Sequence, residues 1–276
     1  MGAEKIIVTP CTPHVGAEIG GVDLTKPLSD SQRAQVHDAF LKHGVVFFRE
    51  QDIGFEDQMR LAGYFGHVHI HVGGEGTASK PAPGFAAIRA QHFDKNSKRI
   101  SGEVWHSDQS CADIPPDGSI LIQKILPPDG GGDTLFASAY AAYEALSPAM
   151  KAFLETLTAE HDGAKLFDKA GTTVYPKAVH PVVTTHPETG RKLLFVNAGF
   201  TTRVVELARD ESDALLKHLF DHIAKPHWQM RFRWRPNSIA FWDNRCTQHF
   251  AIWDYWPNVR SGYRVQFEGT VRPSRG

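Results

Sequence analysis

Histidine and aspartate side chains separated by one residue could bind a metal ion together. Such a pair occurs at His106 and Asp108, and again at His92 and Asp94. On a strand, residues i and i+2 point to the same face, so both side chains of a pair would reach one ion. The first pair follows Trp105 and precedes a Pro-Pro step and an apolar run, whereas the second lies in a polar stretch. His106 and Asp108 are therefore the preferred candidates.

A third candidate ligand is His249. It ends the segment Phe241–His249, which is typical of a strand that runs into a turn. Two neutral imidazoles and one carboxylate form the ligand set that suits Fe(II) in oxygen-activating enzymes, with three positions left open. Zinc accepts the same ligands and usually keeps one position for water. The ligand types alone leave both metals open.

The elements that must position these residues are mainly strands. Short β-branched or aromatic runs bounded by Gly, Pro, Asn or Asp predict them. The predicted strands are Val45–Phe48, Ile120–Ile125, Val182–Thr185, Leu193–Val196, Met230–Arg235 and Ile239–Trp242. Helices are predicted after the capping box of Ser29 and Gln32, after the Ser147-Pro148 step and over Asp210–Lys225. Strands and helices do not alternate regularly, which favours a mainly β fold with helical supports over a doubly wound parallel sheet.

Length and composition exclude several classes of protein. The chain has 276 residues, 41% of them hydrophobic, and a formal net charge of -1, so it is not disordered. A balanced charge gives no basic footprint for nucleic acid, and no apolar run is long enough to span a membrane. We expect one domain over residues 1–276, a cytoplasmic location and reduced thiols at Cys11, Cys111 and Cys246, which lack CxxC spacing. The Gly-rich stretch 72–85 is a possible active-site lid.

Many spaced segments of the chain match one family. They are Thr12–Pro13, Gly16–Ile19, Asp23–Thr25, His69–His71, Trp105–Asp108, Gly131–Thr134, Val196–Arg203 and Trp242–His249, followed by Arg260 and Arg264. Over nearly its whole length the chain resembles the TauD/TfdA family of iron- and 2-oxoglutarate-dependent dioxygenases. The resemblance implies a double-stranded β-helix (jelly-roll) core, Fe(II), O2 and the cosubstrate 2-oxoglutarate, which is decarboxylated to succinate and CO2. It also implies a small organic anion as substrate, with taurine or another alkylsulfonate favoured, and a homo-oligomer.

The resemblance also assigns roles to particular residues. It implies that His106, Asp108 and His249 are the catalytic metal ligands. Thr134 and Arg260 would hold the distal carboxylate of 2-oxoglutarate, in agreement with the bidentate binding of carboxylates by guanidinium groups. The residues implied for substrate binding are His71, Gln109, Phe200 and Arg264, with His71 and Arg264 at the anionic end and Phe200 as a wall.

The rest of the substrate pocket departs from the pattern of the taurine enzymes. The segment after His71 lacks their aromatic residue, and the residues before Trp105 lack the Asn that helps to bind the taurine amine. Glu103 is either a replacement partner for an ammonium group or a solvated loop acid. An aryloxyalkanoate or a sulfate ester would also suit an anion clamp of Arg and His. A zinc hydrolase or a non-catalytic binding protein on the same fold is the alternative from another class.

Overall fold

The computed structural model describes residues 5–70, 80–100, 102–167 and 174–276. Its largest element is an eight-stranded sheet. The strands lie in the order β1 (Ile7–Pro10), β2 (Ala17–Gly20), β3 (Val45–Phe48), β14 (Ile239–Asp243), β6 (Gly118–Ile125), β16 (Arg260–Phe267), β5 (Phe85–Phe93) and β4 (Pro81–Ala82). Every residue of β3 and β14 is buried, because the sheet is covered on both faces at this point.

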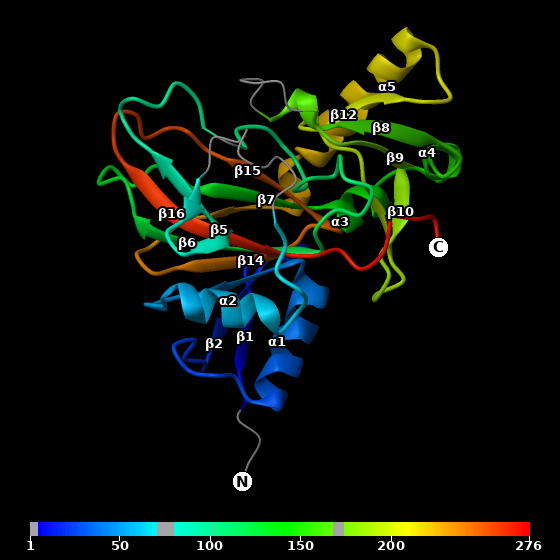
Figure 1. The fold of residues 1–276 in the computed structure, drawn as a ribbon. Helices are drawn as coiled ribbons and strands as arrows, with labels where there is room; N and C mark the ends of the chain where they lie inside the picture. The colour runs from blue at the N-terminus through cyan, green and yellow to red at the C-terminus, as the bar shows by residue number, and fades with distance from the viewer. Residues whose placement is uncertain (1–4, 71–79, 101, 168–173) are drawn as a thin grey trace.

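A smaller sheet packs on one face of the large sheet and completes the jelly roll (Figure 1). Its strands are β13 (Gln229–Phe232), β7 (Thr134–Ser138) and β15 (Thr247–Ala251). Aromatic side chains fill the space between the sheets, and the rings of Phe47 and Phe232 stack with centroids 3.9 Å apart. Stacked pairs of this kind add to the stability that apolar burial provides. The mouth of this sandwich holds the candidate site.

Helices α1 (Asp30–His43) and α2 (Phe55–Gly63) cover the other face of the large sheet (Figure 1). The Ser29 hydroxyl accepts a hydrogen bond from the backbone N–H of Gln32, whose side chain accepts in return from the Ser29 N–H, so the capping box begins α1 as expected. Gly44 ends the helix in a left-handed conformation, with φ of 71°.

A third layer supports the site from behind. It consists of the sheet β12 (Thr201–Val204), β8 (Thr158–Asp162) and β9 (Lys177–Pro181), the hairpin β10 (Val183–Thr185) and β11 (Lys192–Leu194), the helices α3 (Ala139–Glu144), α4 (Pro148–Leu154) and α5 (Arg209–Ile223), and the 3-10 turns η2 (Gly163–Lys165) and η3 (Pro226–Trp228). A single cluster of buried apolar residues joins these elements apart from β9 and η2.

The structure confirms the mainly β class with helical supports, and all three predicted helices are present. The predicted strand Val45–Phe48 is observed with the same bounds. Many observed elements were not predicted, among them the strand β5 and the helix α2. The possible lid at 72–85 falls largely on residues 71–79, which lie outside the described part, while residues 81–82 form β4. Among the described residues no helix is long and apolar enough to cross a membrane.

Candidate active site

His106 and His249 lie opposite each other in an isolated antiparallel β-bridge. The His106 N–H donates to the His249 carbonyl at 3.1 Å, and the His249 N–H donates to the His106 carbonyl at 2.9 Å. Residues that oppose each other in this way direct their side chains to the same face. The two imidazole centroids are therefore only 4.1 Å apart. Backbone pairing between distant segments thus brings two candidate ligands together.

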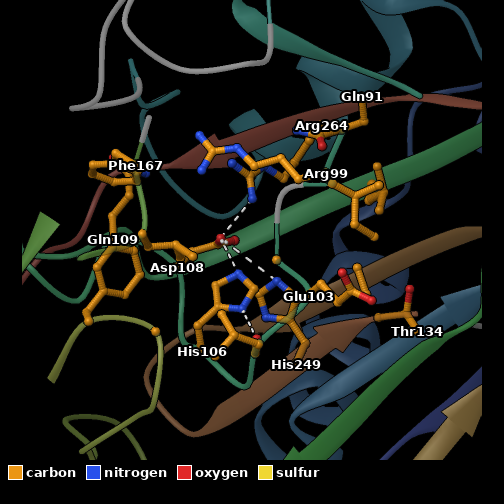
Figure 2. A pocket seen from close by; sticks show the side chains of 18 of the residues that line it. Gln91, Arg99, Glu103, His106, Asp108, Gln109, Thr134, Phe167, His249 and Arg264 are labelled. Carbon is orange, nitrogen blue, oxygen red and sulfur yellow. Dashed lines mark hydrogen bonds and ion pairs between the residues drawn. The ribbon is translucent and has the colours of Figure 1, made fainter. Parts of the chain in front are cut away.

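Asp108 completes the cluster from the turn that follows His106, not from a strand as the spacing suggested. Its Oδ1 lies 3.7 Å from Nε2 of His106 and 3.9 Å from Nε2 of His249. Ligand bonds of about 2.0–2.2 Å place neighbouring donor atoms roughly 3 to 4 Å apart, so one ion fits among these three atoms. All three side chains are buried and converge in Figure 2. The predicted His-Asp-His triad is present.

The protonation of the triad suits a divalent cation. Burial lowers the pKa of both imidazoles, that of His249 well below its ordinary value, so both are neutral. His106 Nδ1 donates to the carbonyl of Val104 at 2.8 Å, which leaves its Nε2 lone pair for a metal. Burial would raise the pKa of Asp108, but the Arg264 charge and the two histidines hold it well below its usual range. One carboxylate and two neutral imidazoles result.

Arg260 and Thr134 lie together at one end of the same cavity, which has a volume of about 490 Å³. Arg260 Nη2 is 3.5 Å from Thr134 Oγ1, and the Thr134 hydroxyl also accepts from the indole N–H of Trp234 at 3.0 Å. Arg260 Nε donates to the Gly132 carbonyl at 2.9 Å. Gly132 has φ of +83°, and a Cβ there would stand 2.7 Å from Arg260 Cδ, so glycine is required. The last glycine before Asp133 therefore makes room for the arginine.

The positive charge of Arg260 is buried beside Thr134, where it could bind an anion. Only 4% of the residue is exposed, and burial lowers its pKa to about 10. No carboxylate of the described residues lies within ion-pair distance of it. Buried charges require a partner, because desolvation is otherwise costly. A ligand carboxylate beside Thr134 would supply that partner.

Arg264 stands over the triad (Figure 2). Its Nη1 donates to Asp108 Oδ1 at 2.8 Å. Its buried Nε has no hydrogen-bond partner among the described residues. A guanidinium offers five N–H donors in a planar fork, so the contact with Asp108 leaves donors for an incoming anion. The arginine can therefore face the metal ligand and a substrate at once.

Apolar side chains line the remainder of the cavity. Phe200 is 1% exposed, and its ring lies 6.4 Å from that of His106, as expected for a wall of the site. Phe167 meets Phe200 edge to face with centroids 5.4 Å apart. Leu166 continues this wall toward Lys165, whose ammonium group donates to the Thr201 carbonyl at 2.6 Å. The described side chains of this wall, Leu166, Phe167 and Phe200, offer contact to a carbon chain and include no carboxylate for an ammonium group.

Two of the expected substrate-binding residues, His71 and Gln109, have no side chain that the structure shows free to contact a substrate. His71 lies outside the described residues, so its role stays a prediction. Gln109 lines the cavity, but its side chain donates to Gln266 at 2.8 Å and accepts from His69.

Glu103, the other acid considered for the substrate, is exposed. Burial raises the pKa of Tyr255 to about 12, and the negative charge of Glu103 contributes to this increase. Tyr255 packs against Gly132, so Glu103 belongs to the Arg260 end of the cavity.

Sequence reasoning missed two residues that touch the triad. Ser119 and Gln266 both donate to Asp108 Oδ2, at 2.7 and 3.1 Å. Neither residue type suggests chemistry by itself. The only available signal was the spacing of Gln266 two residues after Arg264, which places both on one face of a strand.

A second group of potential ligands, His186, Asp243 and Cys246, is an ion-pair cluster instead. Arg245 binds both oxygens of Asp243, at 2.8 and 2.7 Å. The backbone N–H groups of residues 188 and 189 donate to Nδ1 of His186, so its Nε2 carries the proton and donates to Asp243 at 3.0 Å. No lone pair is left on this imidazole for a metal. The cluster fixes the turn that leads to His249.

The chain is similar to known proteins of one kind. The sequence pattern of the family described as "Taurine catabolism dioxygenase TauD, TfdA family" matches residues 7–266. The alpha-ketoglutarate-dependent sulfonate dioxygenase of Saccharomyces cerevisiae is 33% identical, over 95% of this chain and 66% of its own length. The alkylsulfatase of Acinetobacter baylyi is 33% identical, over 97% of this chain and 86% of its own. The crystal structure of a taurine dioxygenase from Burkholderia xenovorans is 35% identical with a TM-score of 0.84, covering 97% of this chain and 90% of that one.

A jelly roll with a buried His-Asp-His triad and a buried arginine in the same cavity is typical of a metal-dependent oxygenase that uses a dicarboxylate cosubstrate. The chain belongs to the TauD/TfdA family and is a 2-oxoglutarate-dependent dioxygenase. This result removes the zinc hydrolase and the non-catalytic protein as alternatives.

Proposed function

We propose that the protein is an Fe(II)-dependent enzyme that hydroxylates a small organic anion carrying an apolar carbon chain, an alkylsulfonate or an alkyl sulfate ester. The observation that carries this proposal is the position of Arg264, which keeps N–H donors available above the metal triad beside an apolar wall. Relatives of the chain include a sulfonate dioxygenase and an alkylsulfatase, which supports both kinds of anion.

His106, Asp108 and His249 would hold Fe(II). When bound, the metal supplies the redox chemistry by which O2 and 2-oxoglutarate yield succinate, CO2 and a hydroxylated substrate. Arg260 and the Thr134 hydroxyl would bind the distal carboxylate of 2-oxoglutarate and so direct its other end toward the triad. Charge-assisted hydrogen bonds of this kind contribute about 1.5–3 kcal/mol each.

Arg264 would orient the substrate by its anionic group, with His71 as the second proposed contact. Phe200 and Phe167 would then enclose the carbon chain and exclude water from the reacting position. Hydroxylation of the carbon that bears the sulfonate or sulfate group gives a product that releases sulfite or sulfate and leaves an aldehyde. Gln109 would contact the substrate through its backbone, because its side chain is engaged elsewhere.

The described lining residues disfavour taurine relative to a simple alkyl anion. Their only carboxylates are Asp108, which faces the triad, and Glu103, which belongs to the Arg260 end. Asp108 is already hydrogen-bonded to Arg264, Ser119 and Gln266, so no free carboxylate of the described residues would meet the far end of the substrate at the wall of Leu166, Phe167 and Phe200. An ammonium group placed there would lose its hydration without gaining a partner.

A substrate panel tests this proposal. Purified enzyme with Fe(II), 2-oxoglutarate and O2 receives hexanesulfonate, hexyl sulfate, taurine or phenoxyacetate, and succinate is measured. We expect the hexyl anions to stimulate succinate formation more than taurine. Phe167→Ala should reduce that preference, whereas Phe153→Ala, which changes an exposed phenylalanine on α4, should not. A clear preference of the wild type for taurine would refute the apolar-chain assignment. A clear preference for phenoxyacetate would show that the substrate anion is a carboxylate and not a sulfonate or sulfate.

A further inference from the structure

The two oxygens of the Asp108 carboxylate face different sets of partners. Oδ1 faces the two imidazoles and Arg264. Oδ2 accepts from the Ser119 hydroxyl at 2.7 Å and from Gln266 Nε2 at 3.1 Å. A carboxylate held only at Oδ1 could rotate about its bond to Cβ, so the contacts at Oδ2 fix which oxygen points to the imidazoles.

The direction of the Ser119 hydrogen bond is determined by its neighbours. Its oxygen lies 2.8 Å from Gln266 Nε2 and 2.9 Å from Asn244 Nδ2, both of which can only donate. A hydroxyl has one hydrogen and two acceptor positions, so its hydrogen must point to Asp108. Ser119 is fully buried, which leaves no room for water to compete.

The orientation of the glutamine amides follows from the same carboxylate. Asp108 accepts only, so Gln266 must turn its Nε2 toward it and its Oε1 toward Gln109. Gln109 must then present its Nε2 to Gln266, at 2.8 Å, and its Oε1 to His69. That oxygen lies 3.2 Å from Nε2 of His69, so the histidine carries its proton on Nε2. The result is a hydrogen-bond network in which His69 donates to Gln109, Gln109 donates to Gln266, and Gln266 donates to Asp108.

This hydrogen-bond network is buried and is attached to the backbone of β16. Gln109 is 1% and Gln266 is 4% exposed. The His69 backbone N–H also donates to the Gln266 carbonyl at 2.8 Å, which fixes the half-buried histidine to the end of β16. Buried amide networks in which every member is satisfied hold a single geometry, because any rotation would leave a polar group unpaired.

We propose that Gln266 and Gln109, supported by Ser119, are positioning residues that hold Oδ2 of Asp108 so that Oδ1 stays directed at the metal. The proposal rests on the metal site proposed above. It explains how Asp108 keeps its orientation when Arg264 also binds a substrate anion. Arg264 and Gln266 lie on one face of β16, but Arg264 contacts Oδ1 and Gln266 holds Oδ2. Removal of such supporting hydrogen bonds typically lowers metal affinity by about 10- to 100-fold.

The test measures Mn(II) affinity of the full chain by calorimetry in the absence of cosubstrate. Gln266→Leu and Gln109→Leu are each expected to bind Mn(II) about 10- to 100-fold more weakly than the wild type. His69→Gln keeps a donor toward Gln109 and should lose less affinity than His69→Leu. Gln58→Leu is the matched control, since Gln58 is equally buried and donates to the carbonyls of Ile120 and Tyr263, not to Asp108. Thermal unfolding shows whether each variant folds.

The outcomes separate this proposal from the proposed function. Wild-type Mn(II) affinity in both glutamine variants, together with loss of binding in His249→Ala, would overturn the positioning role and leave the metal site standing. Equal binding in the wild type and in His249→Ala would overturn both. An equal loss of affinity in Gln58→Leu would show that general destabilisation is the cause, which also overturns the positioning role. Should Gln266→Leu fail to fold, Gln109→Leu decides.

Discussion

Arg264 donates to Asp108 Oδ1 at 2.8 Å, so the arginine proposed to bind the substrate anion also contacts a proposed metal ligand. The contact lies in a buried part of the site, with 13% of the arginine side chain and 5% of the aspartate side chain exposed. The charge of Arg264 is a principal reason for the low pKa of Asp108. In the proposed function, substrate binding and metal binding therefore share one side chain.

This relationship predicts two effects of Arg264→Met. The KM for the anionic substrate should rise at least about 30-fold, because charge-assisted hydrogen bonds worth about 2 kcal/mol or more are lost. Mn(II) affinity should also change, whereas the KM for 2-oxoglutarate should change least. Steady-state kinetics and calorimetry measure these quantities. Arg209→Met, at an exposed position on α5, is the control. An effect confined to 2-oxoglutarate would move Arg264 out of the substrate site.

Arg260→Met should instead raise the KM for 2-oxoglutarate. The increase should correspond to a lost binding free energy on the order of 2–4 kcal/mol. Removal of the buried guanidinium leaves the distal carboxylate with Thr134 as its remaining anchor. Arg231→Met is the matched variant, because Arg231 lies on β13, which pairs with the strand β7 that begins at Thr134, and is already paired with Asp133. An unchanged KM for 2-oxoglutarate in Arg260→Met would refute the assignment.

Metal binding should stabilise the folded chain. At a free Mn(II) concentration of about 100 times Kd, the free energy of unfolding should rise by about 2.7 kcal/mol. His249→Ala should show no such rise, because one of three ligands is missing. Differential scanning calorimetry with and without Mn(II) measures the effect. Stabilisation of His249→Ala as large as that of the wild type would place the metal elsewhere.

The buried His161 predicts a pH dependence of stability away from the metal site. It is 0% exposed, and burial lowers its pKa well below the ordinary value. Its Nδ1 accepts from Ser110, whose oxygen accepts from Asn197. The unfolded chain takes up a proton near pH 6.5, at the ordinary pKa of histidine, and the folded chain does not. The contribution of His161 to stability should therefore be fully present above about pH 6.5 and fall by about 1.4 kcal/mol per pH unit below it.

His161→Gln should decline less steeply than the wild type between about pH 6.5 and 5. His227→Gln, which changes an exposed histidine on η3, should follow the wild type. Urea unfolding at several pH values gives the slopes. Identical slopes in the wild type and His161→Gln would show that this histidine is not held neutral.

Local signals in the sequence were sufficient for the capped helices and for the buried strand Val45–Phe48. β5 was missed because the run Phe85–Phe93 is rich in alanine and contains a single β-branched residue, and its strand conformation depends on pairing with β16. α2 was missed because Gly54 caps it without a side-chain hydrogen bond. Both elements depend on partners distant in the sequence.

The residues proposed to hold ligands could be named from their types and the family motifs, whereas the contacts among them could not. The bridge that sets His106 beside His249 is a long-range backbone pairing. The support of Asp108 by Ser119 and Gln266 comes from neutral side chains whose role appears only in three dimensions. The resemblance placed Gln109 in the substrate site but gave no direction for its side chain.

The central claim is that Fe(II) bound by His106, Asp108 and His249 works with 2-oxoglutarate held by Arg260. Anaerobic addition of Fe(II) and 2-oxoglutarate to the protein, followed by O2 and the substrate panel, tests it most directly. We predict a visible metal-to-ligand absorption band in the wild type, and succinate formation that an alkyl anion stimulates. The band should be absent in His249→Ala, and in Arg260→Met it should appear only at higher concentrations of 2-oxoglutarate. A wild-type protein with no band and no succinate would contradict the account.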